Sequence, residues 1–374
     1  MPSLLLAAAV ATAVTSAARE KIGQVHIALT GDPTQMAVSF RTELPVTSPT
    51  VTPCDAGGSG SCTVHPAVSS RTYTTYKINS GHYHHALVPG TASKLKPDAL
   101  YSYSVGSLDL NDTKKFSFRA PNPDTSSCRV VYTGDFGLGG AGPPIDGLAT
   151  ANAWAALAQA QDRPNVINWV AGDIAYANMH GAFEFEKTWN SWFDALEPAF
   201  AAAPTMVSPG NHETYLPAIA AVASTTGVVH PPPSFFDEHE PREAGAAGSW
   251  NFTAFDHRFF MPGYSNGMGT ANMWYSFDLG GVHFISIDTE TDLPHAAEAF
   301  LNGWGDQISW LKADLAAFSQ QNKQKWLVRH ASVHPCQPAR NSATAASCCL
   351  LVRTYVSAAR LTNETGVLLC DLES

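Results

Sequence analysis

Three short blocks of the sequence carry side chains that bind metals or transfer protons. They are Gly134-Asp135-Phe136-Gly137, Gly172-Asp173-Ile174-Ala175-Tyr176 and Gly210-Asn211-His212-Glu213. Each block directly follows a short apolar run, and 38 residues separate Asp135 from Asp173, as they do Asp173 from Asn211. An interval of this length fits one strand and one helix. Each block therefore follows the previous block by one strand–helix unit.

Taken singly, each block has an ordinary structural explanation. A Gly-Asp pair after a strand is usually a turn whose Asp caps the next helix. An Asn-His pair suits a loop, and a lone Tyr is commonly half-buried packing. The regular spacing favours a shared site, because ligands bind at the carboxyl ends of strands in an open α/β sheet. Two carboxylates, a phenol, an amide oxygen and an imidazole would then meet at one edge.

These donors suit a pair of hard metal ions and not a soft thiolate site. A carboxylate can bridge two cations, and a phenolate favours a strongly acidic ion such as Fe(III). Two metals a few ångströms apart generate hydroxide at mild pH and hold both oxygens of a phosphoryl transfer. A neighbouring His can protonate the leaving alkoxide. The residues alone therefore indicate metal-assisted hydrolysis of a phosphoester.

The segments around these blocks predict an α/β layered domain, because strands alternate with helices. We expect strands at 129–133, 165–171, 205–208, 274–279 and 282–288, and helices at 149–161, 184–196 and 307–319. The first part of the chain reads instead as all β. Runs of strand type lie at 25–29, 36–40, 73–78, 85–88, 101–106 and 116–120. Residues 95–103 look like the turn and aromatic strand of a fibronectin-III-type sandwich.

The composition indicates which partners the protein can bind, and the N-terminal segment indicates its cellular location. The formal net charge is −10 and no basic run occurs, so nucleic acid and anionic membranes are excluded as expected partners. Residues 4–11 are a short apolar stretch followed by small residues, which is typical of a signal peptide spanning 1–18. Sequons at Asn111, Asn251 and Asn363 suit secretion. We expect a secreted, extracellular or vacuolar-lysosomal glycoprotein.

The seven cysteines are an odd number, so they cannot all pair within one chain. Cys54 and Cys62 bracket a Gly/Ser loop and could close a local disulfide. Cys348, Cys349 and Cys370 crowd the C-terminus, and the remaining pairing stays open. No C-x-x-C pair occurs, so a zinc-finger site is not supported.

The three blocks resemble the GDxG, GDxxY and GNH[DE] motifs of the purple acid phosphatases, in the calcineurin-like metallophosphoesterase superfamily. The resemblance covers roughly residues 22–326 and includes the segments 24–29, 189–198, 251–255, 273–278 and 282–290. It implies an α+β two-domain fold: a fibronectin-III-like sandwich over 22–122, then a four-layer α/β/β/α metallophosphatase domain over 126–328.

The resemblance also implies a role for each candidate residue. Asp135 and Tyr176 would bind Fe(III), and Asp173 would bridge the two metals. Asn211 would bind the second, divalent ion, which in this family is Zn, Mn or Fe. His212 would orient the phosphate and protonate the leaving group.

The resemblance stops near residue 328. The family supplies three further His ligands from a strand end and a GHxH block, whereas residues 329–338 do not align and no GHxH follows. One hypothesis is that 329–374 is a frameshifted or mis-spliced tail, so that the catalytic domain is C-terminally incomplete. Another is that the chain is a genuine metal-poor relative. We expect His330 and His334 to be ordinary loop histidines.

The function predicted from the sequence is that of an acid phosphatase hydrolysing phosphate monoesters of small molecules, with the possibility of a homodimer left open. A phosphodiesterase or nucleotide pyrophosphatase of the same superfamily is one alternative, because metal ligands do not set the leaving group. A non-catalytic secreted pseudophosphatase is another, favoured by the missing His blocks. A Ser-nucleophile hydrolase is unlikely to fit, since no G-x-S-x-G elbow follows a strand.

Overall fold

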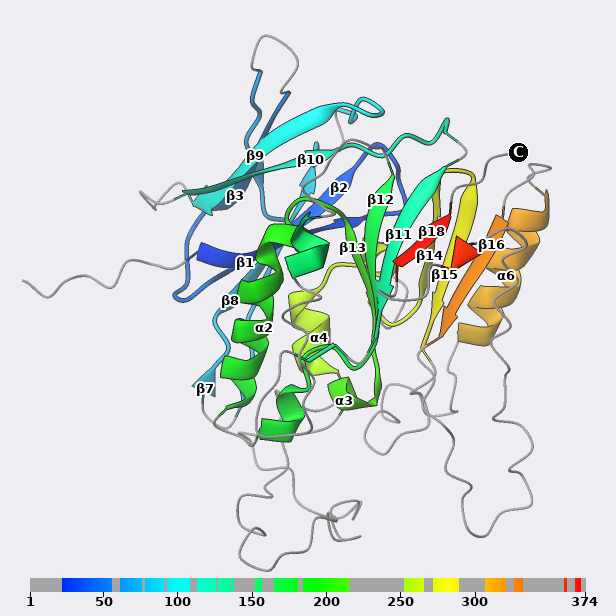
Figure 1. Ribbon diagram of the computed structural model, residues 1–374. Coiled ribbons are helices and arrows are strands. Elements are labelled where there is room, and N and C mark those ends of the chain that lie inside the picture. Colours follow the sequence, from blue (N-terminus) through cyan, green and yellow to red (C-terminus); the bar gives the residue numbers. More distant parts are fainter. Residues whose placement is uncertain are drawn as a thin grey trace, which may run out of the picture.

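The computed structural model describes most of the chain between residues 22 and 370 (Figure 1). The described residues are 22–55, 61–75, 78–90, 93–107, 113–125, 127–134, 136–137, 152–156, 165–180, 184–214, 252–265, 272–288, 307–320, 326–331, 360–361 and 367–370. The predicted signal peptide and the asparagines of the three sequons lie outside them. Within the described residues, no helix has the length and apolar character needed to cross a membrane.

The N-terminal part is a sandwich of two antiparallel sheets. One sheet has the order β1 (Ile22–Leu29), β2 (Met36–Thr42), β8 (His82–Val88) and β5 (Ser69–Arg71). The other has the order β10 (Thr113–Arg119), β9 (Leu100–Ser107), β3 (Pro49–Asp55) and β4 (His65–Pro66). Alternate apolar side chains fill the space between the sheets, as period-2 patterning requires. The predicted sandwich is confirmed.

One predicted strand of this part is wrong. The segment 73–78 forms no continuous strand; it contributes to a small hairpin of β6 (Thr74–Thr75) and β7 (Ile78–Asn79). The chain folds back because Tyr73 and Ser80 exchange two hydrogen bonds, from Ser80 N to Tyr73 O (3.1 Å) and from Tyr73 N to Ser80 Oγ (3.2 Å).

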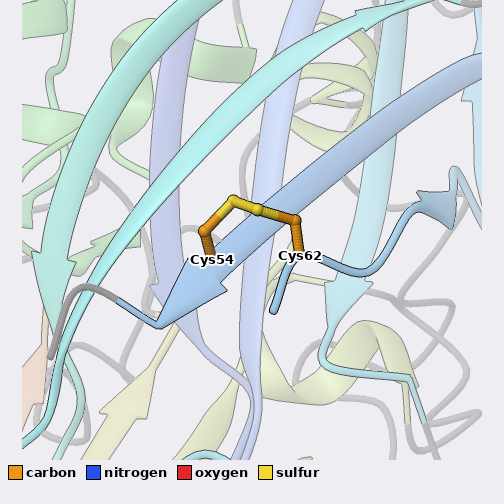
Figure 2. The surroundings of a disulfide bond; sticks show 2 residues. All are labelled: Cys54 and Cys62. Carbon is orange, nitrogen blue, oxygen red and sulfur yellow. A yellow bond between two sulfur atoms is a disulfide. The ribbon is translucent and has the colours of Figure 1, made fainter. Parts of the chain in front are cut away.

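The predicted disulfide is confirmed. Cys54 and Cys62 are partners in an isolated antiparallel bridge, with Cα atoms 4.2 Å apart, and their sulfur atoms are bonded (Figure 2). The bond closes the Gly/Ser loop at the end of β3. It therefore fixes the end of β3, an inner strand of the second sheet of the sandwich.

The second part contains two stacked sheets. The first has the order β13 (Thr205–Ser208), β12 (Val166–Ala171), β11 (Cys128–Thr133), β18 (Val367–Cys370) and β17 (Arg360–Leu361). Strands β11, β12 and β13 are parallel, whereas β18 runs antiparallel to β11. The second sheet has the order β14 (Tyr275–Leu279), β15 (Val282–Ile287) and β16 (Trp326–Ala331).

Aromatic packing holds the two sheets together. Trp169 of β12 contacts Phe277 of β14 and Phe284 of β15, with ring centroids 5.8 and 5.4 Å apart. Helix α2 (Phe185–Phe200) and helix α6 (Gln307–Gln320) lie on opposite sides of this pair of sheets (Figure 1). The predicted four-layer α/β/β/α order is therefore confirmed.

Helix α2 is longer than the sequence predicted. It runs on from Leu196 to Phe200 through Pro198, and four of its buried aromatic side chains face the core. These are Phe185, Trp189, Trp192 and Phe193. Of the predicted helix 149–161, residues 152–156 are described and are helical. Shorter helical segments complete the part: η1 (Ala177–His180), α3 (Asn211–Thr214), α4 (Thr253–Arg258) and α5 (Pro262–Ser265).

The described parts of the C-terminal region are strands. The expectation of a loop is wrong for His330, which lies in β16 opposite Ser286 of β15. The reason is that 326–331 pairs with β15 along its whole length, so the strand continues past the apolar residues 326–328 through Arg329 and His330. His334 lies outside the described residues.

A buried cationic cluster joins the two parts of the molecule. The side chain of Arg258 in α4 is fully buried, and its Nη2 donates to Glu186 Oε2 of α2 at 2.8 Å. Its guanidinium lies over the rings of Tyr83 (4.9 Å) and Tyr73 (5.3 Å) from the sandwich and of Trp189 (4.9 Å) from α2. The guanidinium of Arg258 in α4 therefore contacts both the sandwich and helix α2.

Candidate functional site

The loop after β12 leaves the sheet through a sharp turn. Gly172, Asp173 and Tyr176 all have positive φ, at 77°, 49° and 54°. Left-handed backbone is costly for a residue with a side chain, most of all for a bulky one. The neighbouring contacts must therefore hold Asp173 and Tyr176 in place.

Three of the five predicted site residues meet at this turn. Tyr176 Oη donates to Asp173 Oδ2 at 3.3 Å, and the backbone N–H of His212 donates to Asp173 Oδ1 at 3.1 Å. His212 Nε2 lies 4.0 Å from Asp173 Oδ2. The rings of Tyr176 and His212 pack with their centroids 4.2 Å apart. The second and third sequence blocks therefore form one constellation.

For the other two predicted residues, Asp135 and Asn211, the structure describes the neighbouring backbone but not the side chain. Asp135 lies outside the described residues, but Phe136 N donates to Asp173 O at 3.0 Å, which brings the first block against the second. Trp192 of α2 anchors this contact, because its Nε1 donates to Phe136 O at 2.6 Å. Asn211 is the first residue of α3, and its side chain is outside what the structure describes.

Glu213 is a functional residue that the sequence reasoning missed. Its buried carboxylate accepts three backbone N–H groups, from Asp173 (3.0 Å) and Gly210 (2.8 Å) at Oε2 and from Ile174 (2.8 Å) at Oε1. Burial raises the pKa of Glu213 well above its usual range, and the nearby charge of Asp173 adds to this. Its position in the third block was the available signal, but two of its three partners, Asp173 and Ile174, lie 40 and 39 residues away in the chain.

Gly210 lets the two loops approach each other. A Cβ atom at this position would lie 2.3 Å from Asp173 Oδ1 and 2.4 Å from Asp173 N. Neither distance is compatible with van der Waals contact, and one of the two atoms belongs to the backbone. The absence of a side chain at 210 is therefore a condition for the position of the Asp173 carboxylate.

Asn178 orients His212. His212 Nδ1 lies 2.9 Å from Asn178 Oδ1, and Asn178 is itself buried. An amide oxygen only accepts, so this contact places the proton on Nδ1 and leaves Nε2, on the side of Asp173, to exchange a proton. Asn178 is the second residue that the sequence reasoning missed.

The described donors fit part of a metal centre. Carboxylate and phenol oxygens, here Asp173 and Tyr176, are ligands for hard cations. Among the described residues, no group of three or more His, Cys, Asp or Glu side chains could hold a metal ion. The side chains of Asp135 and Asn211, which would complete the predicted set on this edge, lie outside that part.

Comparisons with known proteins point to one family. A family model described as the N-terminal domain of purple acid phosphatase matches residues 22–120. Purple acid phosphatase 23 of Arabidopsis thaliana is 26% identical over 279 residues, covering 68% of this chain and 49% of that protein. Purple acid phosphatase 22 of the same plant is 27% identical over 312 residues, covering 82% and 55%. The chain thus spans about half the length of the curated relatives it matches.

A solved structure supports the fold. A purple acid phosphatase from yellow lupin (Lupinus luteus) seeds superposes with a TM-score of 0.59 at 20% sequence identity. The alignment covers 83% of this chain and 50% of that one. At this identity the match concerns the arrangement of the elements and not the chemistry.

Proposed function

Because the chain carries the N-terminal domain of the purple acid phosphatases and resembles them beyond it, we propose that it is a phosphatase of phosphate monoesters. The observation that supports this most directly is the meeting of Asp173, Tyr176 and His212 at the end of β12. The proposed substrates are small phosphorylated molecules. The proposed cofactors are Fe(III) and a divalent ion.

We assign some of the site residues to metal binding and one to protonation of the leaving group. Tyr176 and Asp135 would hold Fe(III), Asn211 the divalent ion, and the two oxygens of Asp173 would serve both. When bound, such a metal pair supplies a hydroxide at mild pH and neutralises phosphate charge. His212, held through Nδ1 by Asn178, would give a proton from Nε2 to the departing alkoxide. Glu213 keeps the two loops in register without touching the substrate.

Secretion follows from the predicted signal peptide over 1–18 and is also a proposal. A secretory or vacuolar-lysosomal location suits an enzyme in which Asp135 and Tyr176 would hold Fe(III), because this ion would supply its chemistry at acidic pH. The domain limits, 22–122 and 126–328, are proposed on the same footing. A homodimer stays a prediction that analytical ultracentrifugation of the purified protein would test.

A non-catalytic role is the second candidate, because no GHxH block follows residue 328. Metal content distinguishes the two. Elemental analysis of the purified chain should give about two metals per chain, iron among them, if the enzyme reading is right. Little or no metal, together with no hydrolysis of 4-nitrophenyl phosphate, would favour the non-catalytic role.

Two variants test the individual residues. Asp173→Asn should lower the metal content, because an amide has a single oxygen to offer and no charge. His212→Ala should keep the metal and slow turnover of esters with poor leaving groups more than that of 4-nitrophenyl phosphate. Full metal content in Asp173→Asn would contradict the bridging role, and equal slowing of all esters in His212→Ala would contradict the proton transfer.

A further inference from the structure

Two cysteines that lie far apart in the sequence are Cα partners on neighbouring strands of the first sheet of the second part. Strand β18 runs antiparallel to β11, and Cys128 is the Cα partner of Cys370. The next pairs in this register are Arg129 with Leu369 and Val130 with Leu368. The two cysteines thus lie where the first residue of β11 meets the last residue of β18.

This register meets the geometric requirement for a disulfide. Directly opposed residues of an antiparallel pair have Cα atoms about 4.5 or 5.5 Å apart, depending on their hydrogen bonding. Both values fall within the roughly 4.4–6.8 Å that disulfides span. Opposed residues also project to the same face of a sheet. Cys54 and Cys62 already show the arrangement in this molecule, since they are bonded partners of an antiparallel bridge.

We propose that Cys128 and Cys370 form a second disulfide, which fastens the C-terminal strand to the central sheet. The oxidant is a small-molecule disulfide of the secretory type, such as oxidised glutathione. One cysteine thiolate attacks it and releases one thiol; the other thiolate then attacks the mixed disulfide and releases the second. Two protons leave the cysteines, and two electrons pass to the oxidant.

The position of the bond makes it structural and not redox-active. Cys128 is buried, and its Cβ lies beside Gly280 at the turn between β14 and β15. It sits at the opposite end of β11 from Thr133, after which the candidate site begins. The bond would close a loop containing the whole site and leave three cysteines: Cys336, Cys348 and Cys349. The inference does not depend on the proposed phosphatase activity.

Peptide mapping of the full chain tests this pairing. The protein is folded in a glutathione redox buffer, alkylated without reduction, digested and examined by mass spectrometry. We expect one linked peptide joining Cys128 to Cys370, beside the Cys54–Cys62 linkage as an internal control. Alkylated Cys128, or Cys128 linked to any of the three remaining cysteines, would overturn the proposal.

Hydrogen exchange adds a second readout with a matched control. In Cys370→Ser the amide protection of residues 367–370 should fall by roughly tenfold or more, because the strand is no longer covalently held. Cys349→Ser, a tail cysteine outside the proposed pair, should leave it unchanged. Equal protection in wild type and Cys370→Ser would count against the bond. If Cys370→Ser does not fold, the wild-type peptide map still decides.

Discussion

Glu213 has no predicted chemistry of its own, yet three backbone N–H groups converge on its carboxylate. Two of them belong to the turn that holds Asp173, and the third belongs to Gly210, three residues before Glu213 in its own loop. A single buried acceptor thus stabilises the left-handed backbone at Asp173. The geometry of the site is therefore set by a residue that need not touch a ligand.

We expect Glu213→Gln to destabilise the fold. The amide keeps one oxygen, but its NH₂ group faces backbone N–H donors, so at least one buried donor loses its acceptor. The free energy of unfolding should fall by about 1–3 kcal/mol, measured by urea unfolding. Glu184→Gln is a suitable control, because the Glu184 side chain is 52% exposed and accepts a hydrogen bond from the exposed Lys187. Equal effects of the two substitutions would contradict the role given to Glu213.

At the scale of elements, His283 ties helix α6 to the second sheet. Its Nδ1 lies 2.8 Å from Asp278 Oδ1 of β14 and its Nε2 lies 2.9 Å from Asp314 Oδ2 of α6, while its ring stacks on Phe318. Burial lowers the pKa of His283, but hydrogen bonds and charges from Asp278 and Asp314 outweigh it and raise the pKa to about 9.

This pKa predicts the pH dependence of the α6 contact. A histidine whose pKa is raised on folding contributes its full stability below its unfolded pKa of 6.5, and loses it as the pH rises through about 9. Relative to His283→Gln, the wild type should lose about 1–2 kcal/mol of unfolding free energy between pH 6 and pH 10; partial exposure of Asp278 keeps this value small. Parallel pH profiles for the two proteins would show that folding does not raise the pKa of His283.

The elements themselves were largely predictable, and the contacts between them were not. Short apolar runs between Gly-containing loops predicted β11, β12 and β13, and the equal spacing of the blocks matches their neighbouring places in one sheet. The role of Glu213 could not be predicted, because two of its three partners are backbone N–H groups of another loop. The pairing of β18 with β11 depends on a return of the chain over more than 230 residues, for which local pattern offers no signal.

At the scale of the whole molecule, Arg258 forms one of the contacts that join the sandwich to the α/β part. Arginine side chains are mostly exposed in proteins, yet this one is buried among two tyrosines, a tryptophan and Glu186. A buried charge pair is costly to break from one side, because the remaining charge is left without compensation. The two parts should therefore unfold together.

A double-mutant cycle tests this junction. Arg258→Met should destabilise the protein by about 3–5 kcal/mol, because Glu186 stays buried without its partner. Adding Glu186→Gln should recover part of that loss, as measured by thermal unfolding. Lys187→Met, which breaks only an exposed pair with Glu184, should cost about 0.5 kcal/mol or less. Additive losses in the double variant would show that the two charges do not interact.

The close approach at Gly210 has a consequence for how relatives of this chain are judged. One methyl group there would push the Asp173 carboxylate aside while every ligand-type residue remained in the sequence. The product of a duplicated gene could therefore lose its activity by substitution of the glycine at this position, while every other motif residue is kept. The presence of every metal-ligand residue is then a poor guide to which family members are active. The glycine beside those residues has to be checked as well.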